Sequence, residues 1–307
     1  MAVAPSMTAP KGHQARKKIQ AALNEYYGSD GDLHEDAAGI TKHRAAVLRK
    51  FGVAPSYIGV FELALLHVST SNTIPTLFWF VAYVITRPDV VARVRKEAEA
   101  MVDRKPGQDE VTVNVDVLAE KCPLLVSCYR EAIRLGNKGL GNRRVMTDTT
   151  ISDGKGSTYL LKKGVDVMMP AEPLHKSESV WGNAEASADE FWADRFYEAE
   201  QDKAALNTPE AKAKRASYMP FGGGRHLCPG RNFAFGENLG FMVSFLLGFD
   251  ISPVDGDWKA FKEPVMDRCS IAGAVAKPVD EGKGFGMRVG RREGWEAVRW
   301  KFTSGGV

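Results

Sequence analysis

Apolar positions recur at helical spacing through the first 135 residues of the chain. Apolar side chains three and four positions apart lie on one face of a helix, so this pattern predicts helices that each bury one side. The turn-forming sequence GSDG at residues 28–31 separates the first two of them. The predicted helices cover residues 14–27, 35–51, 57–86, 88–102 and 122–135.

Strand-like alternation replaces this spacing over residues 144–168, where two glycine-containing turn sequences interrupt it. Helical spacing returns over residues 228–247, and short strands are expected over residues 250–307. Two polar stretches, 104–112 and 198–216, are expected to lie on the surface. The pattern therefore predicts a mainly α fold with a smaller β region.

The apolar run over residues 57–86 is long enough to cross a lipid bilayer. It contains Glu62, His67, Asn72 and Pro75, and polar or ionisable side chains are costly inside a membrane. The run is therefore interpreted as a long central helix of a globular protein, with a local kink at Pro75.

Composition agrees with a globular protein, because 44% of the 307 residues are hydrophobic and 26% are charged. A formal net charge of +3 is too small to indicate nucleic-acid binding. Residues 1–16 are a polar tail without the apolar core of a signal peptide, and no separate membrane anchor precedes the central helix. The four cysteines show no C-x-x-C spacing, which argues against zinc or disulfides and for an intracellular protein: Cys122, Cys128, Cys228 and Cys269.

Cys228 lies between glycines on both sides, in the sequence FGGGRHLCPG at residues 221–230. Pro229 favours the first position of a helix, which would make Cys228 the N-cap residue. The free N–H groups of a first helical turn and the helix dipole would then favour a thiolate. The three consecutive glycines are expected to supply positive-φ turns and a close backbone approach to a large flat ligand.

This run resembles the cytochrome P450 signature, Phe-x-x-Gly-x-(Arg/His)-x-Cys-x-Gly. The resemblance implies that Cys228 is the axial ligand of haem b iron, within a loop defined by Phe221, Gly224 and Gly230. His226 stands where most members have arginine, and either residue can hydrogen-bond a haem propionate. The alternative is a glycine-rich turn that contains a buried free cysteine.

Two further stretches follow in the order of the same family. Glu131 and Arg134 match its Glu-x-x-Arg helix, where residues three apart share a face and can pair. The sequence FWADRF at residues 191–196 resembles the next motif, with alanine in place of the usual proline at position 193. The resemblance implies that Arg195 completes a structural ion network beneath the haem.

A second propionate contact is expected from an arginine in the β region. Arg143 stands where many family members place such a residue, and Arg144 is the alternative. The competing interpretation is an exposed arginine of a strand.

The central helix carries Asn72 and Thr73 where most family members have an acid followed by threonine. That pair relays protons to bound oxygen. Thr73 keeps the hydroxyl, but an asparagine cannot give and regain a proton as a carboxylate does. The sequence NTIP at residues 72–75 resembles the branch with sterol 7α- and 12α-hydroxylases and prostacyclin synthase, of the eukaryotic microsomal type. The alternative is that both residues are ordinary polar positions in a helix.

The resemblance implies a haem-thiolate monooxygenase that inserts one oxygen atom from O2 into an apolar, lipid- or sterol-like substrate. Electrons would come from NADPH through a reductase. A second hypothesis is a haem-thiolate isomerase or dehydratase of oxygenated lipids. The resemblance begins near Lys17 and covers only the C-terminal part of a full-length member. Full-length relatives of this type are anchored in the endoplasmic reticulum membrane. We therefore expect residues 17–307 to form a truncated cytochrome P450 domain, and an inactive or haem-free fragment is the third hypothesis.

A basic surface near the cysteine suggests the partner. An acidic NADPH-cytochrome P450 reductase would be attracted to it. A solvated charged loop is the alternative. The basic residues are Lys212, Lys214, Arg215, Arg225 and Arg231.

Overall fold

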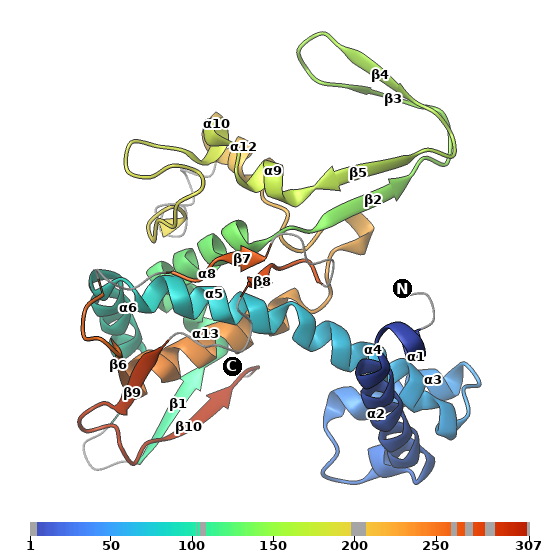
Figure 1. Cartoon of the computed structure of the whole chain (residues 1–307), viewed down its shortest axis with the longest axis horizontal. Coiled ribbons are helices and arrows are strands. Elements are labelled where there is room, and N and C mark those ends of the chain that lie inside the picture. The colour runs from blue at the N-terminus through green and yellow to red at the C-terminus, as the bar shows by residue number, and fades with distance from the viewer. Residues whose placement is uncertain are drawn as a thin grey trace. The chain divides into compact units, whose positions relative to one another are not determined.

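The computed structural model of the chain divides into two compact units, residues 1–71 and 72–307 (Figure 1). The chain is mainly helical with short strands, which confirms the predicted fold class. The structure describes residues 5–102, 104, 109–197, 207–258, 263–267, 273–279 and 286–305.

The first unit is helical. Its longest helices pack so closely that a Cβ atom added at Gly59 would lie 2.5 Å from the backbone nitrogen of Asn24. Glu62 is buried in this unit and accepts two hydrogen bonds of 3.0 Å from Nε of Arg44. The first helix was predicted to begin at residue 14, but α2 already begins at Pro10, because a proline is well suited to the first helical turn. The helices are α1 (Pro5–Thr8), α2 (Pro10–Gly28), α3 (Gly39–Lys50) and α4 (Pro55–Ser71).

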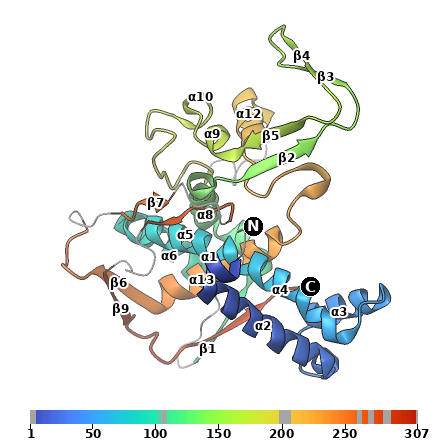
Figure 2. The ribbon, with the colours of Figure 1, turned by 45° about the vertical axis from the view of Figure 1, so that its right-hand side comes forward.

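The second unit is built on four helices that pack against one another, α5, α6, α8 and α13 (Figures 1 and 2). Their facing side chains form a core that includes Trp79, Val94, Leu125 and Met242. Short helices flank this core. The helices of this unit are α5 (Thr73–Ile85), α6 (Pro88–Met101), α7 (Leu118–Lys121), α8 (Pro123–Gly136), α9 (Ala171–His175), α10 (Glu178–Trp181), α12 (Pro209–Ser217) and α13 (Arg231–Gly248).

The strands of the described residues form five two-stranded sheets. The pair β1–β10 is parallel and joins segments far apart in sequence, and the other four pairs are antiparallel. The paired strands are β1 (Glu110–Asn114) with β10 (Arg299–Thr303), β2 (Leu140–Arg144) with β5 (Asp166–Pro170), β3 (Thr149–Ser152) with β4 (Thr158–Leu161), β6 (Phe249–Pro253) with β9 (Met287–Arg291), and β7 (Met266–Asp267) with β8 (Lys277–Pro278).

The predicted central helix is two helices, because α4 ends at Ser71 and α5 begins at Thr73. The sequence placed the irregularity at Pro75, but the break falls at Asn72. Pro75 lies in the first turn of α5, where its missing N–H removes no helical hydrogen bond. The first bond of α5 runs from the Thr76 amide to the Asn72 carbonyl, at 3.0 Å. By length and composition alone, residues 55–85 would be able to cross a membrane, a property shared with core helices of soluble proteins.

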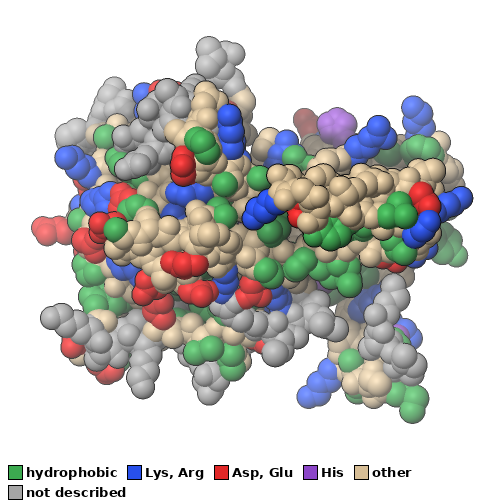
Figure 3. Space-filling view, turned by 90° about the horizontal axis from the view of Figure 1, so that it is seen from above, with side chains coloured by type: hydrophobic (Ala, Val, Ile, Leu, Met, Phe, Trp, Pro, Cys, Tyr) green, Lys and Arg blue, Asp and Glu red, His purple; other side chains and the backbone are tan. Residues whose placement is uncertain are grey.

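The two polar stretches of the sequence have different outcomes. The polar loop predicted over 104–112 gives way to β1 from residue 110, where alternate residues Val111 and Val113 are fully buried. The predicted surface excursion over 198–216 contains the exposed helix α12, and its residues 198–206 lie outside the described part of the chain. Acidic and basic side chains are interspersed on the face shown in Figure 3, as the small net charge leads us to expect.

A buried ion cluster joins α8 to the segment after α10. Glu131 and Arg134 pair three residues apart on α8, and Arg195 binds the same carboxylate, with N–O distances of 2.7 Å for both arginines. All three side chains have no measurable exposure. A buried charge is costly unless it is paired and hydrogen-bonded, so one carboxylate makes the burial of two guanidinium groups tolerable.

The remaining guanidinium donors of the cluster bind main-chain carbonyl groups. Arg134 donates to the carbonyls of His175 and Ala188. Arg195 donates to the carbonyls of Trp181, Ser187 and Glu190. The two arginines thereby bind five main-chain carbonyl groups of residues 175–190.

We expect Glu131→Gln to lower the free energy of unfolding by about 3–5 kcal/mol, because it leaves two buried cations without a counter-charge. Urea unfolding followed by circular dichroism measures this loss. The matched control is Asp166→Asn, which removes the partner of Arg144 in an exposed ion pair and should leave stability almost unchanged. Equal effects of the two substitutions would contradict the structural role of the cluster.

Candidate haem-thiolate site

The loop around Cys228 is closed by its own backbone. The amide of Cys228 donates to the carbonyl of Phe221 at 3.0 Å, and residues 224–226 form a 3₁₀ turn between them. Gly222 and Gly224 have φ angles of 76° and 63°, a region that side chains disfavour. Glycine at these two positions therefore lets the chain turn back so that Cys228 faces the start of the loop.

Two local predictions about this loop were wrong. The helix α13 begins at Arg231, with Gly230 as its N-cap, whereas the sequence pattern placed Cys228 at the N-cap. The amide of Cys228 is engaged by Phe221, and the first helical hydrogen bond runs from Ala234 to Gly230 at 2.9 Å. Gly223 is extended, with φ of −167°, so only its two neighbours need positive φ.

Arg143 reaches this loop and Arg144 does not. Arg143 on β2 donates to the carbonyl of Gly223 at 2.8 Å. Arg144 points to the neighbouring strand, where it makes two hydrogen bonds of 2.8 and 3.0 Å with Asp166. His226 lies on the same loop as Gly223 and is exposed. A guanidinium and an imidazole thus accompany the cysteine loop.

Asn72 and Thr73 lie at the start of α5. The side-chain oxygen of Asn72 accepts a hydrogen bond of 2.7 Å from the amide of Ala274, so it joins the helix to the C-terminal segment. Thr73 is half-buried. The turn expected at residues 270–273 lies outside the described residues except for Gly273, which has φ of 88°.

The cysteines differ in their surroundings. Burial raises the pKa of Cys122 to about 12 and that of Cys128 well above its ordinary value, so both remain thiols at neutral pH. Cys228 is partly exposed, and Cys269 lies outside the described residues. Within the described ranges no cluster of three or more His, Cys, Asp and Glu side chains forms a metal site. The partly exposed thiol of Cys228, with His226 on the same glycine-rich loop and Arg143 bonded to it from β2, fits haem better than a metal ion bound by several side chains.

His175 is a residue of this region whose importance the sequence did not reveal. It ends α9 and is fully buried, and its Nε2 accepts a hydrogen bond of 3.0 Å from the amide of Met219. Because an amide can only donate, Nδ1 carries the proton and donates to the carbonyl of Arg134 at 3.2 Å. Nothing in the spacing of neighbouring residues signals these contacts, which depend on segments 41 and 44 positions away.

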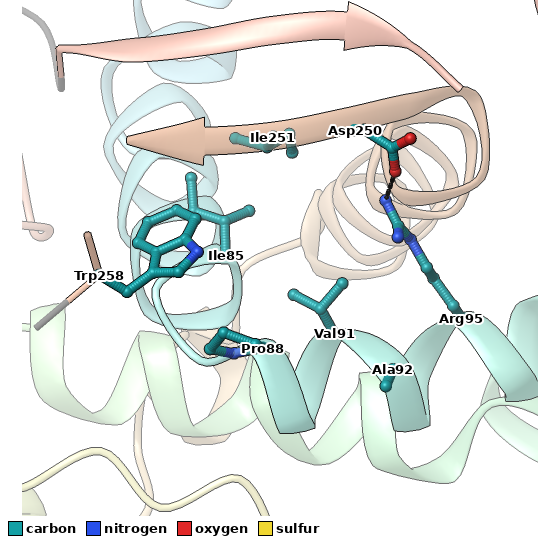
Figure 4. A pocket seen from close by; sticks show the side chains of 8 residues that line it. All are labelled: Ile85, Pro88, Val91, Ala92, Arg95, Asp250, Ile251 and Trp258. Carbon is teal, nitrogen blue, oxygen red and sulfur yellow. Dashed lines mark hydrogen bonds and ion pairs between the residues drawn. The ribbon is translucent and has the colours of Figure 1, made fainter. Parts of the chain in front are cut away.

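A separate cavity of about 200 Å³ lies between α6 and β6 (Figure 4). Apolar side chains, among them Val91 and Trp258, form most of its wall, and the ion pair of Arg95 with Asp250 borders it. None of its lining residues belongs to the cysteine loop, so it is not the haem site.

We expect the stability of the protein to fall as the pH is lowered from about 6.5 to about 4. Burial and the neighbouring Arg134 cation lower the pKa of His175 from 6.5 to about 4, so the unfolded chain binds the proton more readily in this interval. A pKa difference of this size corresponds to about 3 kcal/mol when the interval has been crossed. Urea unfolding at pH 7.5, 6 and 5 measures the fall.

His175→Gln is the matched variant, because it keeps a hydrogen-bond acceptor but does not titrate. The difference in unfolding free energy between the two proteins should shrink as the pH falls. Parallel pH profiles would show that His175 makes no contribution of this kind.

Comparison with known proteins agrees with this geometry. A family model described as cytochrome P450 matches residues 63–269. A cytochrome P450 monooxygenase of Gibberella zeae is 48% identical over 302 residues, which are 98% of this chain and 56% of that protein. The cytochrome P450 monooxygenase nodJ of Hypoxylon pulicicidum is 30% identical, with the same two shares.

A sterol enzyme is also among the relatives. The 5-beta-cholestane-3-alpha,7-alpha-diol 12-alpha-hydroxylase of Sus scrofa is 31% identical over 214 residues, which are 69% of this chain and 42% of that enzyme. The chain spans little more than half the length of the curated relatives it matches. The resemblance drawn from the cysteine loop is confirmed, and the chain belongs to the cytochrome P450 family.

Proposed function

We propose that this chain carries the haem-binding part of a monooxygenase that inserts one oxygen atom from O2 into an apolar, lipid- or sterol-like molecule. The observation that carries the proposal is the closed loop that presents Cys228, with its amide bonded to Phe221 at 3.0 Å. The names of the relatives support the reaction class, because several are cytochrome P450 monooxygenases and others are sterol hydroxylases.

Two residues of the loop and one of β2 would hold the haem in this proposal. Cys228 would be the ligand of the haem iron, and a thiolate ligand supplies electron density that favours O–O cleavage when haem is bound. His226 and Arg143 bind the propionate groups, and the bond from Arg143 to Gly223 holds the loop beside it. The ion cluster around Glu131 includes Arg134, which binds the carbonyl of His175, and His175 in turn binds the Met219 amide just before the loop.

In this proposal Thr73 and Asn72 lie where O2 binds and take part in proton delivery. The hydroxyl group of Thr73 both donates and accepts a hydrogen bond, so a proton can pass through its oxygen atom to and from water. The Asn72 oxygen is bonded to the Ala274 amide, which fits an orienting role better than a proton-donating one. Proton delivery in this proposal therefore passes through Thr73 and water.

An isomerase or dehydratase of oxygenated lipids is the second candidate. The observation that favours it is Asn72 itself, which stands in place of the acid and has its oxygen occupied by a backbone amide. Isomerisation of a peroxide needs neither delivered protons nor an electron donor, so the missing acid would not impair it.

The test uses the full chain expressed with haem supplied, beside Cys228→Ala. We expect the ferrous–CO complex to show the red-shifted Soret band of thiolate-ligated haem, and the variant to lose it because alanine offers no ligand. Turnover of a sterol panel that requires a reduced donor supports the monooxygenase, whereas turnover of a lipid hydroperoxide without a donor supports the isomerase. A band that survives in Cys228→Ala, or no bound haem, would overturn the site assignment for this chain.

A monooxygenase needs an electron donor, and we propose an acidic reductase that docks near α12 and the loop. Lys212, Arg215 and Arg225 are exposed there, and a basic surface raises the rate of association with an acidic protein. The proposal rests on the charge of this surface and on its position next to the cysteine loop in the sequence.

We expect Lys212→Glu to slow electron transfer from the reductase several-fold at low salt, with the difference fading at high salt. Stopped-flow reduction of the haem under CO measures the rate. The control is Lys155→Glu, an exposed lysine in the turn between β3 and β4. Equal rates for the two variants at low ionic strength would remove this docking surface.

A further inference from the structure

The three residues before the cysteine loop are each tied to the α8–α9 region by one hydrogen bond. The hydroxyl group of Tyr218 donates to the carbonyl of Arg130 at 3.1 Å. The amide of Met219 donates to His175, and the carbonyl of Pro220 accepts from the side-chain amide of Asn137, both at 3.0 Å. The next residue is Phe221, whose carbonyl accepts the hydrogen bond from Cys228.

The His175 ring is held rigidly. Its Nδ1–H donates to the carbonyl of Arg134, and the guanidinium of Arg134 donates back to the carbonyl of His175. The ring of Tyr218 lies 5.5 Å from the His175 ring, centre to centre. With its other nitrogen bound to Met219, the imidazole has one orientation and one tautomer.

The side chain of Asn137 is also fixed by two hydrogen bonds. It follows the last residue of α8, is almost fully buried, and its side-chain oxygen accepts from the amide of Gly139 at 2.8 Å. Its side-chain nitrogen is therefore the group that faces Pro220. Pro220 has no N–H, so its carbonyl is its one main-chain hydrogen-bonding group, and that group is bound.

We propose that His175 and Asn137 act as positioning residues for Cys228, and we call the two side chains the loop tether. They fix the two residues that precede Phe221, and Phe221 in turn holds the amide of Cys228. The consequence for catalysis rests on the proposed function, because a positioned sulfur matters most when haem is bound. The contacts of the tether all lie between groups of this chain, so they can be tested separately from haem binding.

The tether requires a neutral imidazole. A protonated ring would carry an N–H group on both sides, and the one at Nε2 would oppose the amide of Met219. The Arg134 cation on α8 disfavours protonation of the ring and is itself paired with Glu131. The ring of Tyr218 covers it from the loop side.

The experiment compares four variants of the full chain prepared without haem. His175→Leu removes both hydrogen bonds of the ring, and His175→Gln returns an acceptor for Met219. Asn137→Asp keeps the acceptor for Gly139 and removes the donor to Pro220. Val94→Ala is the control, because it opens a cavity in the core of the second unit and removes no hydrogen bond of the tether.

The first readout is the alkylation rate of Cys228 by iodoacetamide, mapped to its peptide by mass spectrometry. We expect His175→Leu and Asn137→Asp to raise this rate about tenfold, because Cys228 is only partly exposed in the closed loop and a loop that opens more often exposes more of the thiol. His175→Gln and Val94→Ala should stay within about twofold of the parent chain. Deuterium exchange at the Met219 amide should rise in His175→Leu and Asn137→Asp.

The second readout is the ferrous–CO spectrum after haem is added, where a displaced sulfur gives a smaller share of thiolate-ligated haem. Equal alkylation rates in His175→Leu, Asn137→Asp and Val94→Ala would overturn the tether, as would failure of His175→Gln to restore the parent rate. If circular dichroism shows that His175→Leu is unfolded, Asn137→Asp decides alone. A parent chain that binds no haem would contradict the proposed function and leave the first readout intact.

Discussion

One buried carboxylate, that of Glu131, is the interaction on which the second unit depends. It neutralises Arg134 and Arg195, whose side chains are fully buried with it. An ion pair inside a protein often adds little net stability compared with apolar residues, but removal of one partner leaves an uncompensated charge. The cluster therefore contributes to the specificity of the fold. Its guanidinium groups donate to five carbonyl groups, and these bonds form only when the carbonyl groups face the two arginines.

The cluster and the cysteine loop form one continuous set of contacts. Arg134 binds the carbonyl of His175, and the ring of His175 binds the amide of Met219. Two residues later, Phe221 holds the amide of Cys228. The position of the sulfur is thus linked to α8 through a series of hydrogen bonds, in addition to the packing of Phe221 against the apolar core.

Much of this architecture could be predicted from local pattern. The helix around Glu131 was predicted over 122–135 and runs over 123–136, because one apolar face and a proline in the first turn define it. The start of α13 could not be predicted so well. The sequence offers Pro229 as a helix start, but the hydrogen bond from Cys228 to Phe221 withdraws the cysteine amide into the loop and delays the helix to Arg231. The contacts of His175 escaped prediction for a similar reason, since its partners lie 41 and 44 residues away.

The break before α5 shows how a tertiary contact changes the role predicted for a residue from its sequence. Pro75 suggested a kink within one long helix, yet a proline in a first turn costs nothing, and the helix simply begins two residues before it. The break leaves Asn72 between two helices, where its side-chain oxygen accepts from Ala274, 202 residues away. A carboxylate at the same place would also accept that bond, but it would be held by it in the charged form, because hydrogen bonds to the charged form favour it. Asparagine therefore keeps the connection between α5 and the C-terminal segment without adding a fixed charge at the start of the helix. In the function proposed above, this leaves the hydroxyl group of Thr73 to exchange a proton with water.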